Sequence, residues 1–245
     1  MTEVAAGQRQ RAPLTKARVL EGAVRLADTA GIESLSMRKL GESLGVEGMA
    51  LYRHVRNKEA ILDGVVDAVI AEVSAPSPTA DWRRAMRELA LAARAVMLNH
   101  PWAPALIVSR PEVGMSAIGH FDRVLAILES GGFAIDLAHH ALHVLGSRVF
   151  GFNQELFNDT ADARTDPDTA AAIANELAAT YPSVGRLALA ASHEGGLGGC
   201  DDDFEFAFGL DLILDGLERA RRDGVESEGP APPAPRKEGE SETSM

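Results

Sequence analysis

The sequence predicts an all-α protein, with a small N-terminal three-helix domain that contains a helix-turn-helix and a larger helical domain behind it. Apolar residues recur at spacings of three and four along nearly the whole chain, as on amphipathic helices. Glycine and proline separate these runs, and no convincing strand pattern stands between them. Charge is also segregated: residues 1–60 hold ten Lys/Arg against seven Asp/Glu, and the remaining residues hold fourteen against twenty-nine. This asymmetry favours a basic contact surface on an acidic body.

Composition limits the class of protein further. The 245 residues are 46% hydrophobic and 24% charged, which is typical of a globular protein with a sizeable core. No apolar run approaches the roughly 18 to 20 residues of a membrane span, and the first residues lack the apolar core of a signal peptide. We therefore expect a cytoplasmic protein with no membrane partner. The single cysteine, Cys200, excludes an internal disulfide and has no cation beside it to activate it.

The N-terminal domain is predicted over residues 15–73, after a flexible arm at 1–14. Its first helix begins at Thr15 and ends at Gly31, a typical C-terminal capping residue. Ser36 caps a second helix over 37–44, which Gly45 closes. A third helix of only about seven residues, 49–55, follows a turn of three or four residues. Asn57 caps the fourth, whose apolar positions continue to residue 73.

The larger domain is predicted over residues 80–222, after the proline-rich linker 74–79. Its helices are expected at 80–98, 102–109, 112–130, 136–157, 168–181 and 201–222. Pro182 interrupts the pattern, and the glycine-rich stretch 192–199 is predicted to be a loop. The tail at 223–245 is too polar and too rich in proline to be buried, so we expect it to be disordered.

The short third helix carries the main functional hypothesis. A helix of two turns is marginal in water, so its neighbours must hold it in place. Two short helices joined by a glycine turn can present the second to the DNA major groove, whose width matches one helix. The alternative is that these residues form the solvated polar face of a helical bundle. Residues on or beside the exposed surface, expected to contact bases or phosphates, are Ser36, Arg38, Lys39, Gly48, Met49, Ala50, Tyr52, Arg53, His54 and Lys58.

Several segments of this region resemble one family. They are Gly31-Ile32-Glu33, Ser36-Met37-Arg38-Lys39-Leu40, Leu44-Gly45-Val46 and residues 51–63, LYRHVRNKEAILD. Together they resemble the DNA-binding domain of the TetR family of bacterial transcriptional repressors. The resemblance implies that Arg38 contacts a base and that Tyr52, His54 and Lys58 contact phosphates. Gly48, Met49 and Ala50 differ from the tetracycline repressor, so a different operator sequence is expected.

The larger domain resembles the tetracycline repressor branch of that family at Asp81-Trp82, Leu98-Asn99-His100, Ser109-Arg110-Pro111, Gly131-Gly132-Phe133 and residues 206–218. In that branch a histidine and a carboxylate of the partner subunit hold a magnesium chelate of the drug. Leu106 stands at the histidine position, and Glu155 keeps the acid. Positions that contact the drug align with Ser74, Leu89 and Ala93, of which leucine and alanine offer no polar side-chain group. Neither tetracycline nor magnesium is therefore expected, and no cofactor.

An apolar effector pocket is predicted instead, for a small apolar or amphipathic molecule. His139 and His143 stand four residues apart and could share a metal, but no third ligand is evident, so no metal site is assigned. Each lining residue could alternatively be plain core. The predicted lining consists of Leu89, Ala93, Val96, Met97, Leu106, Ile107, Ser109, Arg110, Phe121, Leu125 and His143.

Wide apolar faces on the helices at 136–157 and 201–222 predict a homodimer, because one domain alone would not cover them. The expected interface residues are Leu137, Leu145, Val149, Phe208, Leu212 and Leu217. A two-fold dimer predicts a palindromic operator. The resulting hypothesis is a ligand-controlled repressor of transcription. The alternatives are a helical enzyme, for which no catalytic motif is found, and a helical scaffold that binds protein.

Overall fold

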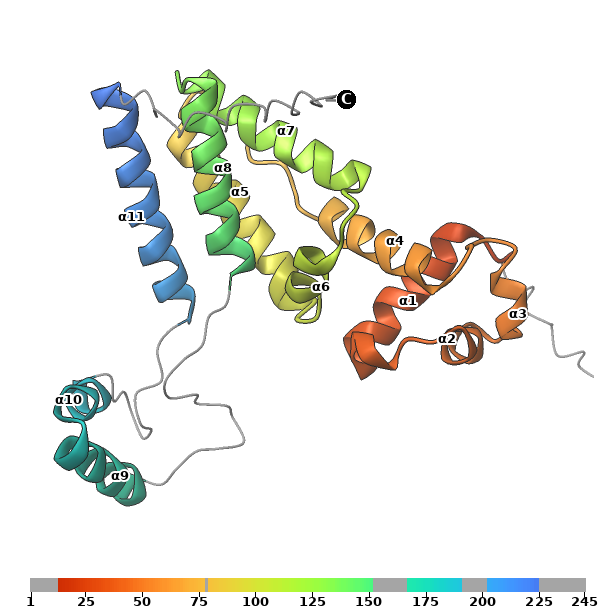
Figure 1. Cartoon of the computed structure of the whole chain (residues 1–245), viewed down its shortest axis with the longest axis horizontal. Coiled ribbons are helices and arrows are strands. Elements are labelled where there is room, and N and C mark those ends of the chain that lie inside the picture. Colours follow the sequence, from red (N-terminus) through yellow and green to blue (C-terminus); the bar gives the residue numbers. More distant parts are fainter. Residues whose placement is uncertain (1–12, 78, 152–166, 191–201, 225–245) are drawn as a thin grey trace, which may run out of the picture.

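The computed structural model describes residues 13–77, 79–151, 167–190 and 202–224, and every regular element within them is a helix (Figure 1). The N-terminal helices are α1 (Lys16–Ala30), the 3₁₀ turn η1 (Ile32–Ser34), α2 (Met37–Leu44), α3 (Gly48–Leu51) and α4 (Lys58–Ala71). The remaining helices are α5 (Trp82–Asn99), α6 (Ala103–Ser109), α7 (Met115–Ser130), α8 (Ile135–Phe150), α9 (Pro167–Thr180), α10 (Pro182–Ala190) and α11 (Asp202–Asp223).

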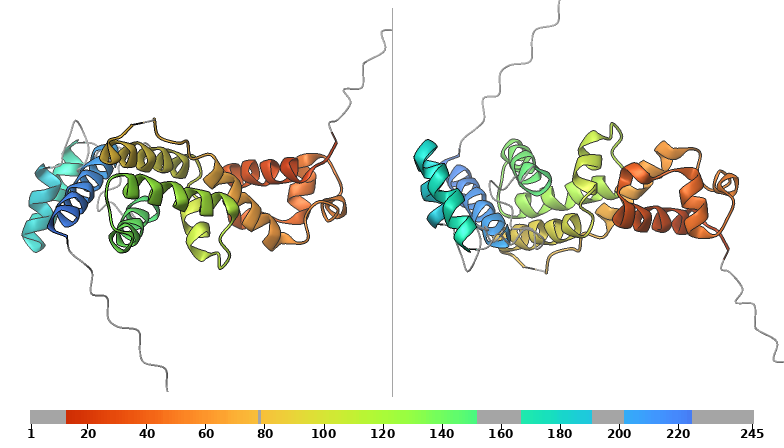
Figure 2. Two further views of the ribbon diagram at one scale, coloured as in Figure 1. Left: turned by 90° about the horizontal axis from the view of Figure 1, so that it is seen from above. Right: turned by 90° about the horizontal axis from the view of Figure 1, so that it is seen from below.

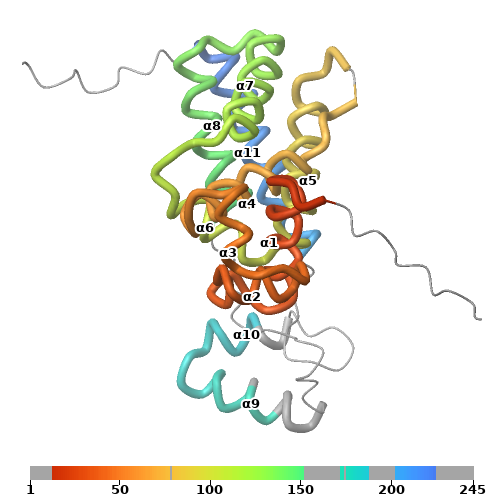
Figure 3. The backbone as a smooth tube through the Cα atoms, turned by 90° about the vertical axis from the view of Figure 1, so that its right-hand side faces the viewer, coloured from red at the N-terminus to blue at the C-terminus, as the bar shows by residue number. Residues whose placement is uncertain are grey.

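The molecule is elongated, with α1–α3 at one end and α9 and α10 at the other (Figure 2). Figure 3 looks along this direction, with the N-terminal helices in front of the larger domain. The helix α4 extends from the first domain to the second. None of the helices in the described ranges combines the length and the apolar character that crossing a bilayer requires.

Local signals in the sequence fix the N-terminal helices. The side chains of Thr15, Ser36 and Asn57 accept hydrogen bonds from backbone N–H groups three residues onward, at 3.2, 3.2 and 2.8 Å. Gly45 ends α2 in the left-handed conformation, at φ 67°, as predicted. Apolar residues of all four helices then pack into one core. Its fully buried members include Val19, Ala23, Leu40, Leu51, Ile61 and Val65.

The larger domain is built around α5, which packs against α7, α8 and α11. Asp81 caps α5 by accepting hydrogen bonds from the backbone N–H groups of Arg83 and Arg84. Trp82 meets the ring of Phe133 edge to face, with ring centroids 4.7 Å apart. The core is completed by buried leucines and methionine from the four helices: Met86, Leu89, Leu128, Leu145, Leu210 and Leu214.

The third helix is shorter than predicted. Its α-helical part is limited to α3, Gly48–Leu51, and the chain continues through a turn to His54. The backbone N–H groups of Arg53 and His54 donate to carbonyls three residues earlier rather than four, which tightens the chain after the helix. The predicted residue Val55 is buried at the end of this turn.

Two other helix boundaries differ from the prediction. The helix α7 begins at Met115 rather than at residue 112, because Gly114 takes the extended N-cap conformation and its carbonyl accepts the first helical hydrogen bond. The helix α10 was not predicted, although Pro182 occupies its first position, where proline is well tolerated. The predicted extension of α8 to residue 157 and the loop at 192–199 lie outside the described residues, as do most of the N-terminal arm and of the tail.

Replacing Gly41 by alanine tests how α2 and α3 are held together. A Cβ atom there would lie 2.8 Å from the carbonyl oxygen of Val46 and 2.9 Å from the backbone nitrogen of Gly48. These are backbone atoms that cannot move without separating the helices. We expect Gly41→Ala to lower the free energy of unfolding by about 1–3 kcal/mol, measured by urea denaturation followed by circular dichroism.

Gly119→Ala is the matched control. Gly119 lies on the exposed face of α7 with no atom within 4 Å of the added Cβ, so alanine there should stabilise by about 1 kcal/mol. Equal effects of the two substitutions would show that the backbone contact at Gly41 does not limit the packing of α2 and α3.

Candidate DNA interface and effector cavity

The helices α2 and α3 approach at backbone distance, which explains the glycines at this crossing. Gly41 lies on α2 opposite the start of α3, and a Cβ on Gly48 would lie 3.1 Å from the carbonyl oxygen of Met37. Gly48 therefore faces α2. Close packing against α2 favours glycine here, and because Gly48 is only half-buried its contact with bases stays a prediction.

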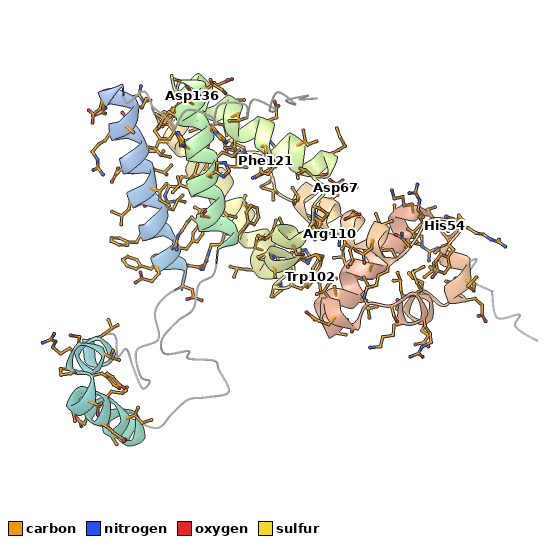
Figure 4. All side chains as sticks on the ribbon, in the orientation of Figure 1. His54, Asp67, Trp102, Arg110, Phe121 and Asp136 are labelled. Atoms are coloured by element: carbon orange, nitrogen blue, oxygen red, sulfur yellow. The ribbon has the colours of Figure 1, made fainter. Side chains whose placement is uncertain are left out.

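The other predicted DNA-contacting residues gather at the end of the molecule formed by α2, α3 and the turn that follows. Met49, Tyr52 and Arg53 are exposed, whereas Ala50 and His54 are half-buried; Figure 4 labels His54 at this end. Ser36 is half-buried as the α2 cap. Arg38, whose side chain is 77% exposed, pairs with Glu42 at 2.7 Å. Lys39 and Lys58 are also exposed.

This surface combines exposed cations and a protruding methionine with a rigid support. Leu51 and Val55 are buried beneath it, so α3 presents its remaining side chains outward. The Arg38–Glu42 pair lies in high dielectric and contributes little to stability, which leaves the guanidinium available for another acceptor. Arginine can bind guanine with two hydrogen bonds in the major groove.

Two neighbouring cavities lie in the larger domain. The first, between α5, α7 and α8, contains about 400 Å³ of empty space, part of it open to solvent. The second, between α4, α7 and the end of α6, contains about 520 Å³ by the same measure. Both are bordered by His120, Phe121 and Phe150, and Figure 4 labels Phe121 on α7.

The structure brings only part of the predicted effector pocket together. Leu89, Ala93 and Phe121 line the first cavity, and Ile107, Arg110 and Phe121 line the second. The other predicted residues border neither cavity. Val96 and Met97 are buried in the core, Leu106 and Leu125 pack against it, and Ser109 and His143 are exposed.

Only some of the residues predicted at the dimer interface are exposed. Phe208 and Leu212 are exposed on α11, at 54% and 56%, beside exposed Phe204. Leu145 and Val149 instead line the first cavity, and Leu217 is buried within the chain. The prediction is corrected for Leu145 and Leu217, because both side chains are enclosed within the chain. Val149 is half-buried, and its place in a dimer interface stays a prediction. Leu137 is half-buried against the core.

A polar joint connects the N-terminal domain to the start of α6. His100 Nδ1 lies 2.7 Å from Asp28 on α1, and its Nε2 lies 3.1 Å from Glu72 at the end of α4. Trp102, labelled in Figure 4, donates its indole N–H to the same Asp28 oxygen at 2.7 Å. Burial alone would lower the pKa of His100, but the hydrogen bonds and charges of the two carboxylates together raise it.

A second joint holds the exposed side of α4. Arg110 donates to Asp63 and to Glu59, each at 2.7 Å, and these two carboxylates stand one helical turn apart. Asp67, one turn further, accepts a hydrogen bond from the backbone N–H of Ser116 at 2.7 Å. Figure 4 shows Asp67 and Arg110 beside the junction of the two domains. Arg110 thus borders the second cavity and binds the helix that leads to the DNA-facing end.

The histidines of α8 lie away from these cavities. His143 Nε2 is 2.9 Å from His139 Nε2, and both side chains are exposed. No group of three or more potential metal ligands occurs among the described residues. The leucine at the metal-binding histidine position, Leu106, packs against the core, and Glu155 lies outside the described ranges.

Sequence reasoning missed two histidines, one at the joint between the domains and one at the border of the two cavities. His120 stands between Ala117 and Val124 on the buried stripe of α7, and its place in that apolar stripe is the signal that could have found it. Burial and the charge of Arg123 lower the pKa of His120. His100 carried no signal beyond the family resemblance, because its partners lie far away in the sequence.

Comparisons with known proteins agree with this architecture. The family model described as "Bacterial regulatory proteins, tetR family" matches residues 19–65, and that described as "Tetracyclin repressor-like, C-terminal domain" matches residues 75–221. The HTH-type transcriptional repressor DrrR1 of Streptomyces coeruleorubidus is 35% identical over 211 residues, which cover 84% of this chain and 77% of that protein. The tetracycline repressor protein class G of Vibrio anguillarum is 32% identical over 211 residues, which cover 85% of this chain and 95% of that protein.

A solved structure shows the same fold. ActR of Streptomyces coelicolor, in complex with actinorhodin, is 28% identical, with a TM-score of 0.64 over 86% of this chain and 99% of that one. The chain belongs to the TetR family of bacterial regulatory proteins, with a C-terminal domain like that of the tetracycline repressor. Its function is that of a ligand-responsive transcriptional repressor, and the matches favour neither an enzyme nor a scaffold.

Arg38→Ala tests the exposed surface of α2. If Arg38 reads a base, its loss should weaken operator binding by about 1–3 kcal/mol and relax sequence preference, measured by fluorescence anisotropy with operator and scrambled DNA. Arg84→Ala is the control, because Arg84 forms the same kind of exposed pair with Glu88, one turn away on α5. An equal loss of affinity in both variants would argue against a base contact by Arg38.

His100→Gln tests the joint between the domains. A pKa raised on folding adds stability that is present below the unfolded-state pKa, about 6.5, and is lost as pH rises through the folded-state pKa. The melting temperature of the wild type should therefore exceed that of His100→Gln most at pH 6, and the difference should shrink toward pH 9. A difference in melting temperature that increased with pH would contradict the raised pKa of His100.

Proposed function

We propose that the protein represses as a homodimer at a palindromic operator and is released by a small, mostly apolar effector. The observation that carries this proposal is the position of α4. Its residues Val66 and Ile70 line the second cavity, while its carboxylates at 59 and 63 hold Arg110 at the edge of the same cavity. The helix that borders the effector space is thereby the helix that follows α3 in the chain and packs against α1 of the DNA-facing domain.

Release follows if the effector prefers one of two arrangements of α4. A ligand that fills the second cavity contacts Val66, Ile70 and Ile107, and it competes for the space next to Arg110. A small shift of α4 would move the DNA-facing surface in each protomer, so that the two surfaces no longer match successive grooves. The effector must bind the DNA-incompetent arrangement more tightly, because only differential affinity shifts a population.

The effector class is inferred from the cavity walls. In the first cavity the lining side chains are apolar except for His120, so the space favours an apolar molecule with few polar groups. ActR has been solved with actinorhodin, and a single-substitution variant of TetR from Acinetobacter baumannii has been solved with minocycline. Both relatives support a small molecule as the effector here, and neither identifies it. An operator-binding protein of this kind acts in the cytoplasm.

The exposed stripe on α11 supports the homodimer. Phe204, Phe208 and Leu212 follow one another at intervals of four residues on the face opposite the buried leucines of that helix. An exposed apolar stripe of this kind is typical of an interface. A two-fold dimer would place its two α3 helices roughly 34–36 Å or somewhat more apart, on two half-sites of one DNA face.

DNA upstream of the protein's own gene is the first target to test. We expect nanomolar binding that weakens as salt rises and a footprint over two inverted half-sites. Selection from random DNA gives the operator if the upstream region does not bind. Failure to enrich any sequence from such a library would contradict the proposal.

Leu212→Glu tests the dimer. A charge in the centre of the apolar stripe should halve the molar mass seen by light scattering at micromolar concentration and abolish tight operator binding. Val108→Glu is the matched control, because Val108 is 73% exposed on α6, away from that stripe. A dimer that persists in Leu212→Glu would place the interface elsewhere.

A further inference from the structure

The two cavities of the larger domain share a border formed by three side chains, His120, Phe121 and Phe150. His120 lies on α7, between the buried residues Ala117 and Val124. The first cavity continues from this border toward Leu89 and Ala93, and the second continues toward Ile107 and Arg110. One elongated molecule could therefore occupy both spaces and pass the imidazole near its middle.

The imidazole offers an unused hydrogen-bonding atom at this point. His120 Nδ1 is buried and has no hydrogen-bond partner among the residues that the structure describes. A buried polar atom without a partner costs roughly 1–3 kcal/mol, so such atoms are uncommon in folded proteins and call for an explanation. A ligand group that hydrogen-bonds to Nδ1 would remove this cost in the bound state.

The charge state of His120 restricts the chemistry of that group. Burial, and to a smaller extent the positive charge of Arg123, lower the pKa of His120 and keep the ring neutral near pH 7. A neutral imidazole nitrogen either donates or accepts one hydrogen bond, according to its tautomer. Hydroxyl and carbonyl groups fit both cases without bringing a charge into an apolar space, where an ionised group would be costly.

We infer that the effector is an elongated, ring-containing apolar molecule with a hydroxyl or carbonyl group near its middle, and that His120 Nδ1 recognises this group. The inference rests on the proposed function, because it names the ligand class of the same cavities. Phe121 and Phe150 border both spaces and supply aromatic rings near the polar contact. His120 is then the specificity-determining residue at the border between the apolar first cavity and the second cavity, which Arg110 and Glu112 also line.

Two probes of nearly equal shape test the inference: 2-naphthol and 2-methylnaphthalene, which differ by a hydroxyl in place of a methyl group. Both are titrated into the full chain by calorimetry or by ligand fluorescence at pH 7.5. The quantity of interest is the ratio of the two dissociation constants in each variant, because it cancels changes that affect both probes.

His120→Leu should lower the preference for 2-naphthol by about tenfold, because the hydroxyl is then buried without a partner. His120→Asn places an amide group close to the position of Nδ1 and should restore part of the preference. Val124→Ala, a neighbouring change in the apolar lining, should weaken both probes to a similar extent and leave the ratio unchanged.

Each outcome either supports or contradicts the inference. An unchanged ratio in His120→Leu would overturn the role of His120, and failure of both probes to bind the wild type would overturn the ligand class. Thermal melting of each variant separates loss of the contact from loss of the fold. Operator binding is measured separately without probe, so a failed DNA assay counts against the proposed function and leaves the probe result standing.

Discussion

The guanidinium of Arg110 joins the larger domain to α4, because it is held between Glu59 and Asp63 on consecutive turns of that helix. Both carboxylates remain partly exposed, so solvent and salt screen the pairing and its net stabilisation is small. The apolar contact beside it is also limited, to a small cluster of Val66, Ile70 and Ala117. Such a joint orients α4 but leaves its position free to shift, which a reversible conformational change requires.

The helix α4 can transmit a shift because it is buried on two sides. Ile61, Val65 and Val69 belong to the core that includes α1–α3, whereas Val66 and Ile70 face α7. A helix that is apolar around most of its circumference is typical of an element enclosed by neighbours. Moving one side of a close-packed helix therefore moves the other side as well.

Predictions from sequence succeeded where short-range chemistry decides the structure. Ser36, Asn57 and Gly45 mark helix ends through contacts within four residues, and the turn between α2 and α3 follows from them. The same reasoning could not determine which apolar residues face a cavity. Leu145 on α8 and Leu212 on α11 look alike in sequence, yet one is enclosed by α5 and α7 and the other is exposed. That distinction depends on how whole helices are rotated against one another.

The candidate site was predicted only where its residues are close together in the sequence. The surface of α2 and α3 is contiguous in sequence, so its exposed members could be proposed from spacing alone. The joints at His100 and Arg110 connect residues that lie 28 to 72 positions apart, and no local pattern encodes those pairs. His120 was overlooked because a histidine in an apolar stripe resembles ordinary core until the space beside it is seen.

The backbone contact between Gly41 and Gly48 has a consequence for how such regulators diverge. Because main-chain atoms set the crossing of α2 and α3, the neighbouring exposed residue Met49 takes little part in holding the domain together. Substitutions at such positions are nearly neutral for folding, so they can accumulate after gene duplication. A duplicated copy can then acquire a new target sequence while it retains its fold and its cavities.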